Sequence, residues 1–172
     1  KEVFHHSTAH VLAHAVSRLF PKSKLTIGPT IEGGYYYDID MNPLTPADLS
    51  KIEKEMQKIV DADYNVKRHE VSKKKALSLF KGNKYKKELI NEIEKNEKIS
   101  YYEQGEFIDL CRGPHVPSTG VMKAFKLTKI SSAYWRGDAK NSSLQRIYGT
   151  SFPDKKQLRK FEILQKEAEK RD

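Results

Sequence analysis

The apolar residues change their spacing several times along the chain, and this feature constrains the fold more than any other. Between residues 7 and 20, apolar side chains recur every three to four positions, which predicts a helix ended by Pro21. Residues 35–40 alternate instead, as in a half-buried antiparallel strand. Residues 45–48 then offer a capping threonine, a proline and an acid for the next helix. These changes predict an α+β fold in which helices pack against an antiparallel β-sheet.

The remaining segments extend this pattern to the end of the chain. The last helix, capped by Asp154, has a narrow apolar stripe and charged residues on its other faces, which is typical of a helix that links domains. We therefore expect residues 1–153 to form one domain and residues 154–172 a C-terminal linker helix. In between we expect strands at residues 24–27, 64–71, 100–103, 106–110 and 124–130, helices at 72–80 and 85–95, a loop at 131–138, and strand or loop at 141–148.

Length and composition limit the class of protein. A chain of 172 residues is long enough for one domain with a real core. No stretch approaches the roughly 18 apolar residues of a membrane span, and no signal peptide is visible, so we expect no membrane contact. The single cysteine, Cys111, excludes an internal disulfide and suits a cytoplasmic location. Because the chain begins with Lys1 and not methionine, we expect it to be part of a longer protein.

Positive charge is concentrated in one segment. The net charge is +9, and residues 67–87 contain nine Lys or Arg residues against one acid, Glu70. Such a segment attracts phosphate backbones and gives salt-dependent binding. A solvated lysine-rich surface would have the same composition, so composition alone leaves both interpretations open.

Two pairs of side chains suited to metal binding or acid/base chemistry are spaced four positions apart. His6 and His10 lie in the first predicted helix, where residues four apart share a face. Cys111 and His115 follow the end of a predicted strand. Each pair alone is compatible with a purely structural role, but two such pairs in one chain favour a joint site.

The residue types exclude some chemistry and leave other chemistry open. A zinc protease of the H-E-x-x-H type is excluded because Ser7 follows His6 where the glutamate base would stand. The local signature of papain-like thiol proteases is also absent. A Cys-His₃ zinc site fits the ligand types, yet four protein ligands fill a tetrahedral zinc and leave no position for water. Without metal, the same side chains form a polar pocket that can hold and activate a water molecule.

Five motifs in this order resemble the editing domain of bacterial threonyl-tRNA synthetase, which is related to the editing domain of alanyl-tRNA synthetase. The resemblance covers nearly the whole chain, and the third and fourth motifs are the most specific. The motifs are His6-Ser7-Thr8-Ala9-His10, Gly28-Pro29 with Gly34-Tyr35-Tyr36-Tyr37-Asp38, Asp109-Leu110-Cys111-Arg112-Gly113-Pro114-His115, Ala133-Tyr134-Trp135-Arg136-Gly137-Asp138, and Leu144-Gln145-Arg146-Ile147-Tyr148-Gly149-Thr150.

The resemblance implies an aminoacyl-tRNA hydrolase within a threonine–tRNA ligase. Such a domain hydrolyses the ester of mischarged seryl-tRNA(Thr) and spares threonyl-tRNA. The need follows from energetics, because one methyl group gives a binding pocket only ~1–3 kcal/mol of discrimination. As alternatives we keep an alanyl-type, zinc-dependent seryl-tRNA deacylase and a non-catalytic tRNA-binding module stabilised by zinc. We expect no cofactor in this domain, although zinc fits the residues His6, His10, Cys111 and His115.

The resemblance also assigns residues to the site. It places His6, His10, Cys111 and His115 in the lining of the pocket, with Asp109 and Lys86 at further polar positions. We hypothesise that His6 contacts the terminal ribose, that Lys86 and His115 position or activate water, and that Cys111 bounds the pocket. The alternative that Cys111 is a covalent nucleophile stays open. His10 and Asp109 would bind substrate, with Asp109 facing the ammonium group of serine. If Cys111 lies near a protonated His or Lys, we expect its thiolate to be favoured. The basic residues expected to bind tRNA are Lys73, Lys74, Lys75 and Lys84.

Further expectations concern partners and the other motif residues. The resemblance implies a tRNA(Thr) acceptor end carrying serine, catalytic and anticodon-binding domains in the same longer chain, ATP binding there, and a homodimeric full-length enzyme. The linker helix would lead toward the catalytic domain. We expect the 35–37 tyrosines to pack within the sheet and Trp135 to be a core residue. His5 and His14 should be structural, and Arg136 and Arg146 should pair with Asp138 or with tRNA.

Overall fold

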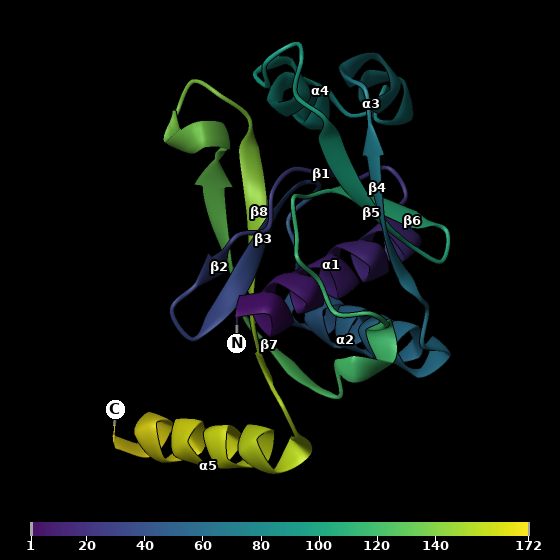
Figure 1. The fold of residues 1–172 in the computed structure, drawn as a ribbon. Coiled ribbons are helices and arrows are strands. Elements are labelled where there is room, and N and C mark those ends of the chain that lie inside the picture. Colours follow the sequence, from purple (N-terminus) through teal and green to yellow (C-terminus); the bar gives the residue numbers. More distant parts are fainter. Residues whose placement is uncertain (1, 172) are drawn as a thin grey trace.

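The computed structural model describes residues 2–171 and confirms the α+β fold (Figure 1). Lys1 and Asp172, the outermost residues of the two expected segments, lie outside the described residues. The helices are α1 (Glu2–Leu19), α2 (Pro46–Ala62), α3 (Lys73–Leu79), α4 (Lys84–Asn91) and α5 (Lys155–Arg171), with 3₁₀ turns η1 (Thr119–Val121) and η2 (Trp135–Gly137). No helix among them combines the length and apolar character needed to cross a membrane.

The strands form two antiparallel sheets instead of the one expected. The larger sheet has the order β1-β3-β8-β7, with β2 paired to β3, and the smaller has the order β4-β5-β6. All strand pairs in both sheets are antiparallel. The strands are β1 (Lys24–Leu25), β2 (Thr30–Ile31), β3 (Gly34–Asp40), β4 (Val66–Val71), β5 (Ile99–Gln104), β6 (Phe107–Leu110), β7 (Ala124–Tyr134) and β8 (Ser143–Phe152).

Helix α1 occupies the centre of the molecule and organises the main core (Figure 1). It packs against α2 and against β3 and β8 of the larger sheet. Its apolar residues Leu12 and Val16 are fully buried together with Tyr35 and Tyr37 of β3, as expected for the tyrosine strand. Its other side meets the β5–β6 hairpin, where the ring of His14 stacks on Phe107 at 4.9 Å. The helix therefore connects both sheets.

Helix α1 begins earlier than the sequence suggests. We expected Ser7 near its start, but the helix begins at Glu2 and Ser7 is a buried interior residue. A serine in a helix interior usually has no advantage over a good helix former. Here its hydroxyl has tertiary partners, described below, which sequence patterns do not reveal.

A second small core explains the separate three-stranded sheet. Ala76 and Phe80 at the α3 end, Ile90 of α4 and Ile99 of β5 are buried together. The expected caps are confirmed in this region and in α2. Ser72 caps α3, while Thr45 forms a capping box at the start of α2 with proline in the first turn. The basic segment therefore belongs to a second packed unit, which consists of α3, α4 and the smaller sheet and is called the α3–α4 lobe below.

The first half of the expected 131–138 loop belongs to strand β7, and a 3₁₀ turn follows it. Strand β7 continues to Tyr134 because residues 131–134 pair with β8, including Ser131 opposite Arg146.

The ion pairs of Arg136 and Arg146 also differ from expectation, since neither arginine pairs with Asp138. Arg146 forms a two-pronged pair with Asp38 at 2.8 and 2.9 Å, and Arg136 pairs with acids of the α4 region. Trp135 is buried as expected.

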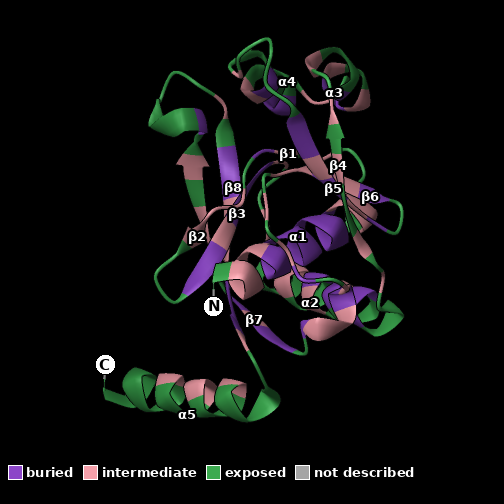
Figure 2. Ribbon diagram, viewed as in Figure 1, coloured by how far each residue is buried: buried purple, intermediate pink, exposed green. Residues whose placement is uncertain are grey.

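Helix α5 stands away from the main body (Figure 2). None of its residues is buried. It contacts the larger sheet through Phe161, whose ring lies 5.4 Å from that of Phe152, and through the ion pair between Lys126 and Glu162. Asp154 caps the helix by accepting from the backbone N–H of Gln157 at 2.8 Å. Ile163 and Leu164 remain more than half exposed.

Candidate active site

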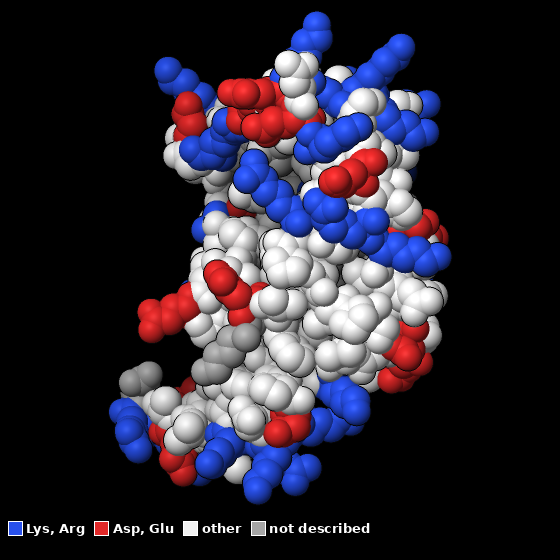
Figure 3. Space-filling model, viewed as in Figure 1, with Lys and Arg blue, Asp and Glu red and all other residues white. Residues whose placement is uncertain are grey.

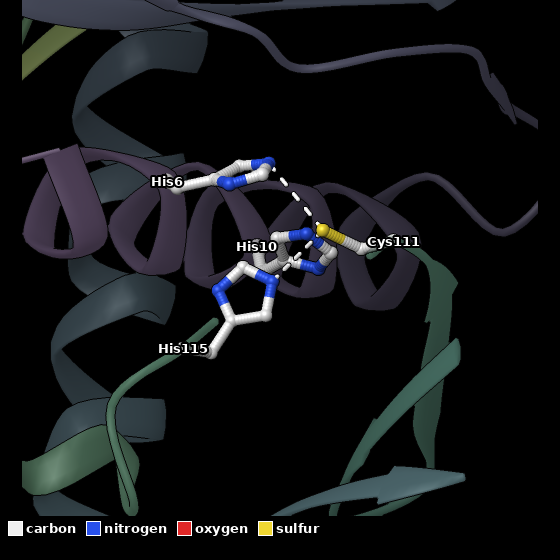
Figure 4. A group of neighbouring side chains, drawn as sticks. All are labelled: His6, His10, Cys111 and His115. Carbon is white, nitrogen blue, oxygen red and sulfur yellow. Dashed lines mark hydrogen bonds between the residues drawn. The ribbon is translucent and has the colours of Figure 1, made fainter. Parts of the chain in front are cut away.

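The two expected pairs of side chains meet in one cluster (Figure 4). The sulfur of Cys111 lies 3.0 Å from Nε2 of His115 and 3.5 Å from Nε2 of His6. The rings of His10 and His115 are 4.4 Å apart, and those of His6 and His115 are 4.8 Å apart. Segments a hundred positions apart in the sequence therefore face one another, as the site hypothesis requires.

Two elements of the fold bring the cluster together. Helix α1 presents His6 and His10 one turn apart on the same face. Strand β6 ends at Leu110, and the chain then turns so that Cys111 and His115 face the helix. Gly113 in this turn has a φ of +80°, and a Cβ there would overlap the hydroxyl group of Tyr102. The turn therefore requires glycine at this position.

Burial keeps the cluster uncharged near neutral pH. Desolvation lowers the pKa of His10 to about 4 and the pKa of His115 to about 2, and it lowers the pKa of His6 as well. Desolvation also raises the pKa of the Cys111 thiol to about 11. The thiolate is therefore not favoured, because the neighbouring imidazoles are neutral and burial outweighs the effect of the Lys86 ammonium on the pKa of Cys111. The site offers neutral imidazole nitrogens and a thiol.

A buried ion pair lies directly behind the cluster. Nζ of Lys86 donates to Asp109 at 2.6 Å, to the carbonyl oxygen of Thr26 at 2.6 Å and to the hydroxyl of Tyr37 at 3.1 Å. Asp109 also lies 3.3 Å from Nδ1 of His10 and accepts from Tyr37 at 2.8 Å. Burial raises the pKa of Asp109, but the Lys86 ammonium outweighs it and the pKa lies below its usual value.

This network affects two of the expected roles. All three donors of the Lys86 ammonium are engaged, and the side chains of Lys86 and Asp109 are 4% and 2% exposed. Water or a substrate ammonium group would reach either residue only after one of these contacts opens. The roles expected for Lys86 with water and for Asp109 with the ammonium of serine therefore stay predictions.

A cleft opens beside the cluster. Its volume is about 540 Å³, within the range of small-molecule sites. Its lining includes Cys111 and Ser100, and polar and apolar surface contribute about equally, with Leu89 of α4 and Leu110 of β6 among the apolar residues. The cationic lining residues are Arg68, Lys98 and Arg112. The cleft thus brings apolar residues, three cationic side chains, the acid Glu97 and Cys111 together.

The lysines expected to bind tRNA lie in the α3–α4 lobe. Lys74, Lys75 and Lys84 are exposed, whereas Nζ of Lys73 donates to the carbonyl oxygens of Asn91 and Ile93 and ties α3 to α4. Lys and Arg side chains gather over this lobe and along α5 (Figure 3). Between these regions the visible face is largely uncharged. The binding of tRNA to these lysines remains a prediction.

The cluster has the donor set of a metal site. One ligand atom from each of His6, His10, Cys111 and His115 lies within 4.8 Å of the others. Three imidazoles and one cysteine are ligands that zinc accepts, and Zn–N and Zn–S bonds of roughly 2.0–2.3 Å place tetrahedral ligand atoms about 3.3–3.8 Å apart. Nδ1 of His10 faces Asp109, the arrangement in which a carboxylate orients a metal-binding histidine. The cluster could therefore hold a metal after small side-chain movements.

The structure adds residues that the sequence did not single out for the site. Ser7 lies between His6 and His10, and its Oγ is 3.0 Å from Nδ1 of His115. Tyr37 was expected only as a packing residue, yet its hydroxyl joins the Lys86–Asp109 pair. A polar residue on the buried side of an apolar helix is a sequence signal for Ser7. Nothing in the spacing of the tyrosine strand distinguishes Tyr37 from its neighbours.

Comparisons with known proteins confirm the resemblance expected from the motifs. Residues 99–148 match the family model of the threonyl and alanyl tRNA synthetase second additional domain. The chain is 55% identical over 174 residues to a threonine–tRNA ligase of Coxiella burnetii and 54% identical over 175 residues to one of Clostridioides difficile. These alignments cover 99% and 100% of the chain but 27% of each relative, so the chain spans about a quarter of the curated relatives it matches.

Proposed function

We propose that this chain hydrolyses the ester bond of a mischarged aminoacyl-tRNA, because residues 99–148 match the second additional domain of threonyl and alanyl tRNA synthetases and nearly the whole chain aligns with threonine–tRNA ligases. The substrate is seryl-tRNA(Thr), and threonyl-tRNA is spared. The activity is a proofreading step within a longer threonine–tRNA ligase, whose remaining domains would form the amino acid ester in an ATP-dependent reaction.

One observation carries this proposal. Neutral imidazoles of His6 and His115 lie within hydrogen-bonding distance of the Cys111 sulfur, and Cys111 also lines a cleft. A neutral imidazole is the side chain best suited to exchange protons near pH 7. A structural role for either pair would not require a cleft of substrate size lined by the same cysteine.

The cleft has the chemistry of the terminal nucleotide of a tRNA. Its apolar residues suit a base, and Arg68, Lys98 and Arg112 suit the phosphates that follow along the strand. The lysines of the α3–α4 lobe, including Lys74, Lys75 and Lys84, would extend this contact to the acceptor end and supply salt-dependent binding.

The reaction needs three events, and the cluster has groups for each. A water molecule adds to the ester carbonyl carbon, and its proton passes to a nitrogen of His6. The carbon–oxygen bond to the ribose then breaks, and the ribose oxygen receives that proton from His6. His115 positions the water, Cys111 bounds the pocket, and His10 orients its neighbours while Asp109 holds its Nδ1.

Discrimination would come from the size of the pocket. Serine lacks one methyl group of threonine, and a synthetic site gains only ~1–3 kcal/mol from such a difference. A second site that admits serine and misplaces the threonine methyl group increases the overall selectivity. In our proposal Asp109 and Lys86 contribute by fixing the position of His10, and they contact the substrate if their mutual bonds open.

A metal-dependent reaction is the second candidate, and the Cys-His₃ donor set favours it. Zinc would be held by His6, His10, Cys111 and His115 and would act as a Lewis acid when bound. Four protein ligands would fill its tetrahedral shell. We therefore propose the metal-free reaction, in which the same residues remain available to water and substrate.

The proposal is tested by the deacylation of seryl-tRNA and threonyl-tRNA by this chain in the presence of a chelator. We expect hydrolysis of the seryl ester, little hydrolysis of the threonyl ester, and loss of activity in His6→Ala. His69→Ala is the matched control, because His69 is a partly exposed histidine of β4 that contacts Glu103, apart from the cluster. Equal rates for wild type and His6→Ala would refute the proposed site. Activity lost in chelator and restored by zinc would favour the second candidate.

A further inference from the structure

The hydroxyl of Ser7 contacts the side of His115 that faces away from the sulfur. Its Oγ lies 3.0 Å from Nδ1 of His115 and accepts from the backbone N–H of Val116 at 3.1 Å. On the other side of the ring, Nε2 of His115 lies 3.0 Å from the sulfur of Cys111. The imidazole is thus held between a hydroxyl and a thiol, with one ring nitrogen toward each.

The hydrogen atoms in this chain of contacts can be assigned by elimination. The Val116 N–H occupies a lone pair of the Ser7 oxygen, so the hydroxyl hydrogen needs an acceptor of its own. Within residues 2–171, the acceptor that the hydroxyl reaches is Nδ1 of His115. An uncharged imidazole that accepts at Nδ1 carries its single hydrogen on Nε2. That hydrogen then points at the sulfur of Cys111.

The other contacts of the cluster agree with a hydrogen on Nε2 of His115 that is donated to the sulfur. The sulfur also accepts from the backbone N–H of Gly113 at 3.3 Å, so it acts as an acceptor toward the turn. Its thiol hydrogen can then be donated to Nε2 of His6 at 3.5 Å. Every hydrogen in the series from Val116 to His6 has one acceptor. The opposite assignment would leave the Ser7 hydroxyl hydrogen without an acceptor in a residue that is 5% exposed.

We propose that Ser7 is a positioning residue that holds His115 as the tautomer with hydrogen on Nε2. His115 then presents a donor to the sulfur of Cys111, whereas Nε2 of His6 is an acceptor for the thiol hydrogen. His10 differs from His115, because its Nδ1 faces the carboxylate of Asp109, which only accepts. The two histidines therefore have opposite tautomers, and the difference originates in their partners, a hydroxyl for one and a carboxylate for the other.

This assignment has consequences for chemistry and for metal binding. A donor at Nε2 orients a water molecule or a carbonyl oxygen but does not remove a proton, so proton removal falls to His6 once its Nε2 has released the thiol hydrogen. A metal at the cluster would need the lone pair of Nε2, so the hydrogen on His115 would first have to move to Nδ1. The consequence for catalysis rests on the proposed function, whereas the tautomer itself does not.

Nitrogen-15 NMR of the whole chain with labelled histidine tests the tautomer directly, with His115→Gln used only to assign the signals. We expect His115 in the wild type to show a protonated Nε2 and an unprotonated Nδ1. Ser7→Ala should shift the His115 nitrogens toward a mixture of tautomers, and Ser7→Thr, which keeps the hydroxyl, should retain the wild-type pattern. A protonated Nδ1 in the wild type would overturn the proposal, and this result requires no variant to fold.

Deacylation of seryl-tRNA by the same proteins tests the consequence. We expect Ser7→Ala to lose about 10- to 100-fold in rate, the usual effect of removing the partner of a site histidine, and Ser7→Thr to recover most of it. An unchanged rate in Ser7→Ala together with a shifted tautomer would refute the catalytic consequence alone. Absence of deacylation in every protein, with the expected tautomer, would refute the proposed function and leave the assignment of Ser7 standing.

Discussion

Breaking the buried ion pair behind the cluster should destabilise the whole domain. Lys86 and Asp109 are 2.6 Å apart, and their side chains are 4% and 2% exposed. The substitution Lys86→Met keeps most of the aliphatic stem and removes the ammonium group, so little packing is lost. Asp109 is left as a buried carboxylate without its cation, and removing one partner of such a pair typically costs ~3–5 kcal/mol. We expect the free energy of unfolding to fall by that amount at pH 7.

Urea denaturation followed by circular dichroism measures this loss. The matched control is Lys126→Met, because Lys126 pairs with Glu162 at 3.2 Å but the two side chains are 34% and 41% exposed. Exposed pairs contribute ~0–1 kcal/mol, so this control should change little. The double variant Lys86→Met with Asp109→Asn should cost ~2–3 kcal/mol less than the sum of the two single variants, because no unpaired charge remains.

The pH dependence gives a second signature of the same pair. The pKa of Asp109 lies below its usual value because the Lys86 ammonium outweighs the effect of burial. Its contribution to stability is therefore present above the pKa of the unfolded chain, ~3.9, and is lost as pH falls through the lower folded value. In Lys86→Met burial of Asp109 is no longer offset by the ammonium, so its folded pKa should lie above the unfolded value and stability should rise as pH falls. The reasoning is refuted if Lys86→Met costs as little as Lys126→Met.

Three other predictions follow from the structure. Burial lowers the pKa of His10 to about 4, so the free energy of unfolding should fall by up to ~1.4 kcal/mol per pH unit below pH ~6.5. Urea titrations of His10→Asn should show a shallower fall. An identical slope would contradict the lowered pKa of His10. Gly34→Ala should cost ~1–3 kcal/mol of stability because the new Cβ would overlap the Gly149 carbonyl oxygen. Gly82→Ala should be neutral or stabilising, because a Cβ there meets nothing within 4 Å. Equal thermal midpoints for the two variants would exclude the steric overlap as the cause. Changing Lys74, Lys75 and Lys84 to Ala should reduce the slope of log affinity for tRNA against log salt by ~2–3, and an unchanged slope would remove these lysines from the interface.

The sequence predicts the elements best where local chemistry decides them. The Thr45 capping box, the Ser72 cap and the buried tyrosine strand are all present, because capping and alternation act within a few residues. Strand β7 was underestimated because Ser131 and its neighbours are held by pairing with β8, which is distant in sequence. The split into two sheets likewise depends on long-range packing around Phe80 and Ile99.

The site was predicted in composition but not in its internal contacts. Spacing and residue type were sufficient to bring His6, His10, Cys111 and His115 together. Spacing could not show that Lys86 is saturated by three acceptors, because two of them, Thr26 and Tyr37, come from other parts of the fold. It also placed Ser7 near a helix start, although its hydroxyl contacts the distant His115. Burial, which no local pattern specifies, decides the pKa of Cys111.

The central claim is that the opening helix and the cysteine turn form one hydrolytic site, and a double-variant cycle tests it most directly. Single-turnover hydrolysis of seryl-tRNA is measured for wild type, His6→Ala, His115→Ala and the variant that carries both changes. Residues that act as a unit lose their effect together, so the account predicts that the double variant is about as slow as the slower single variant. Rate losses that multiply, or single variants that hydrolyse seryl-tRNA as fast as wild type, would contradict it.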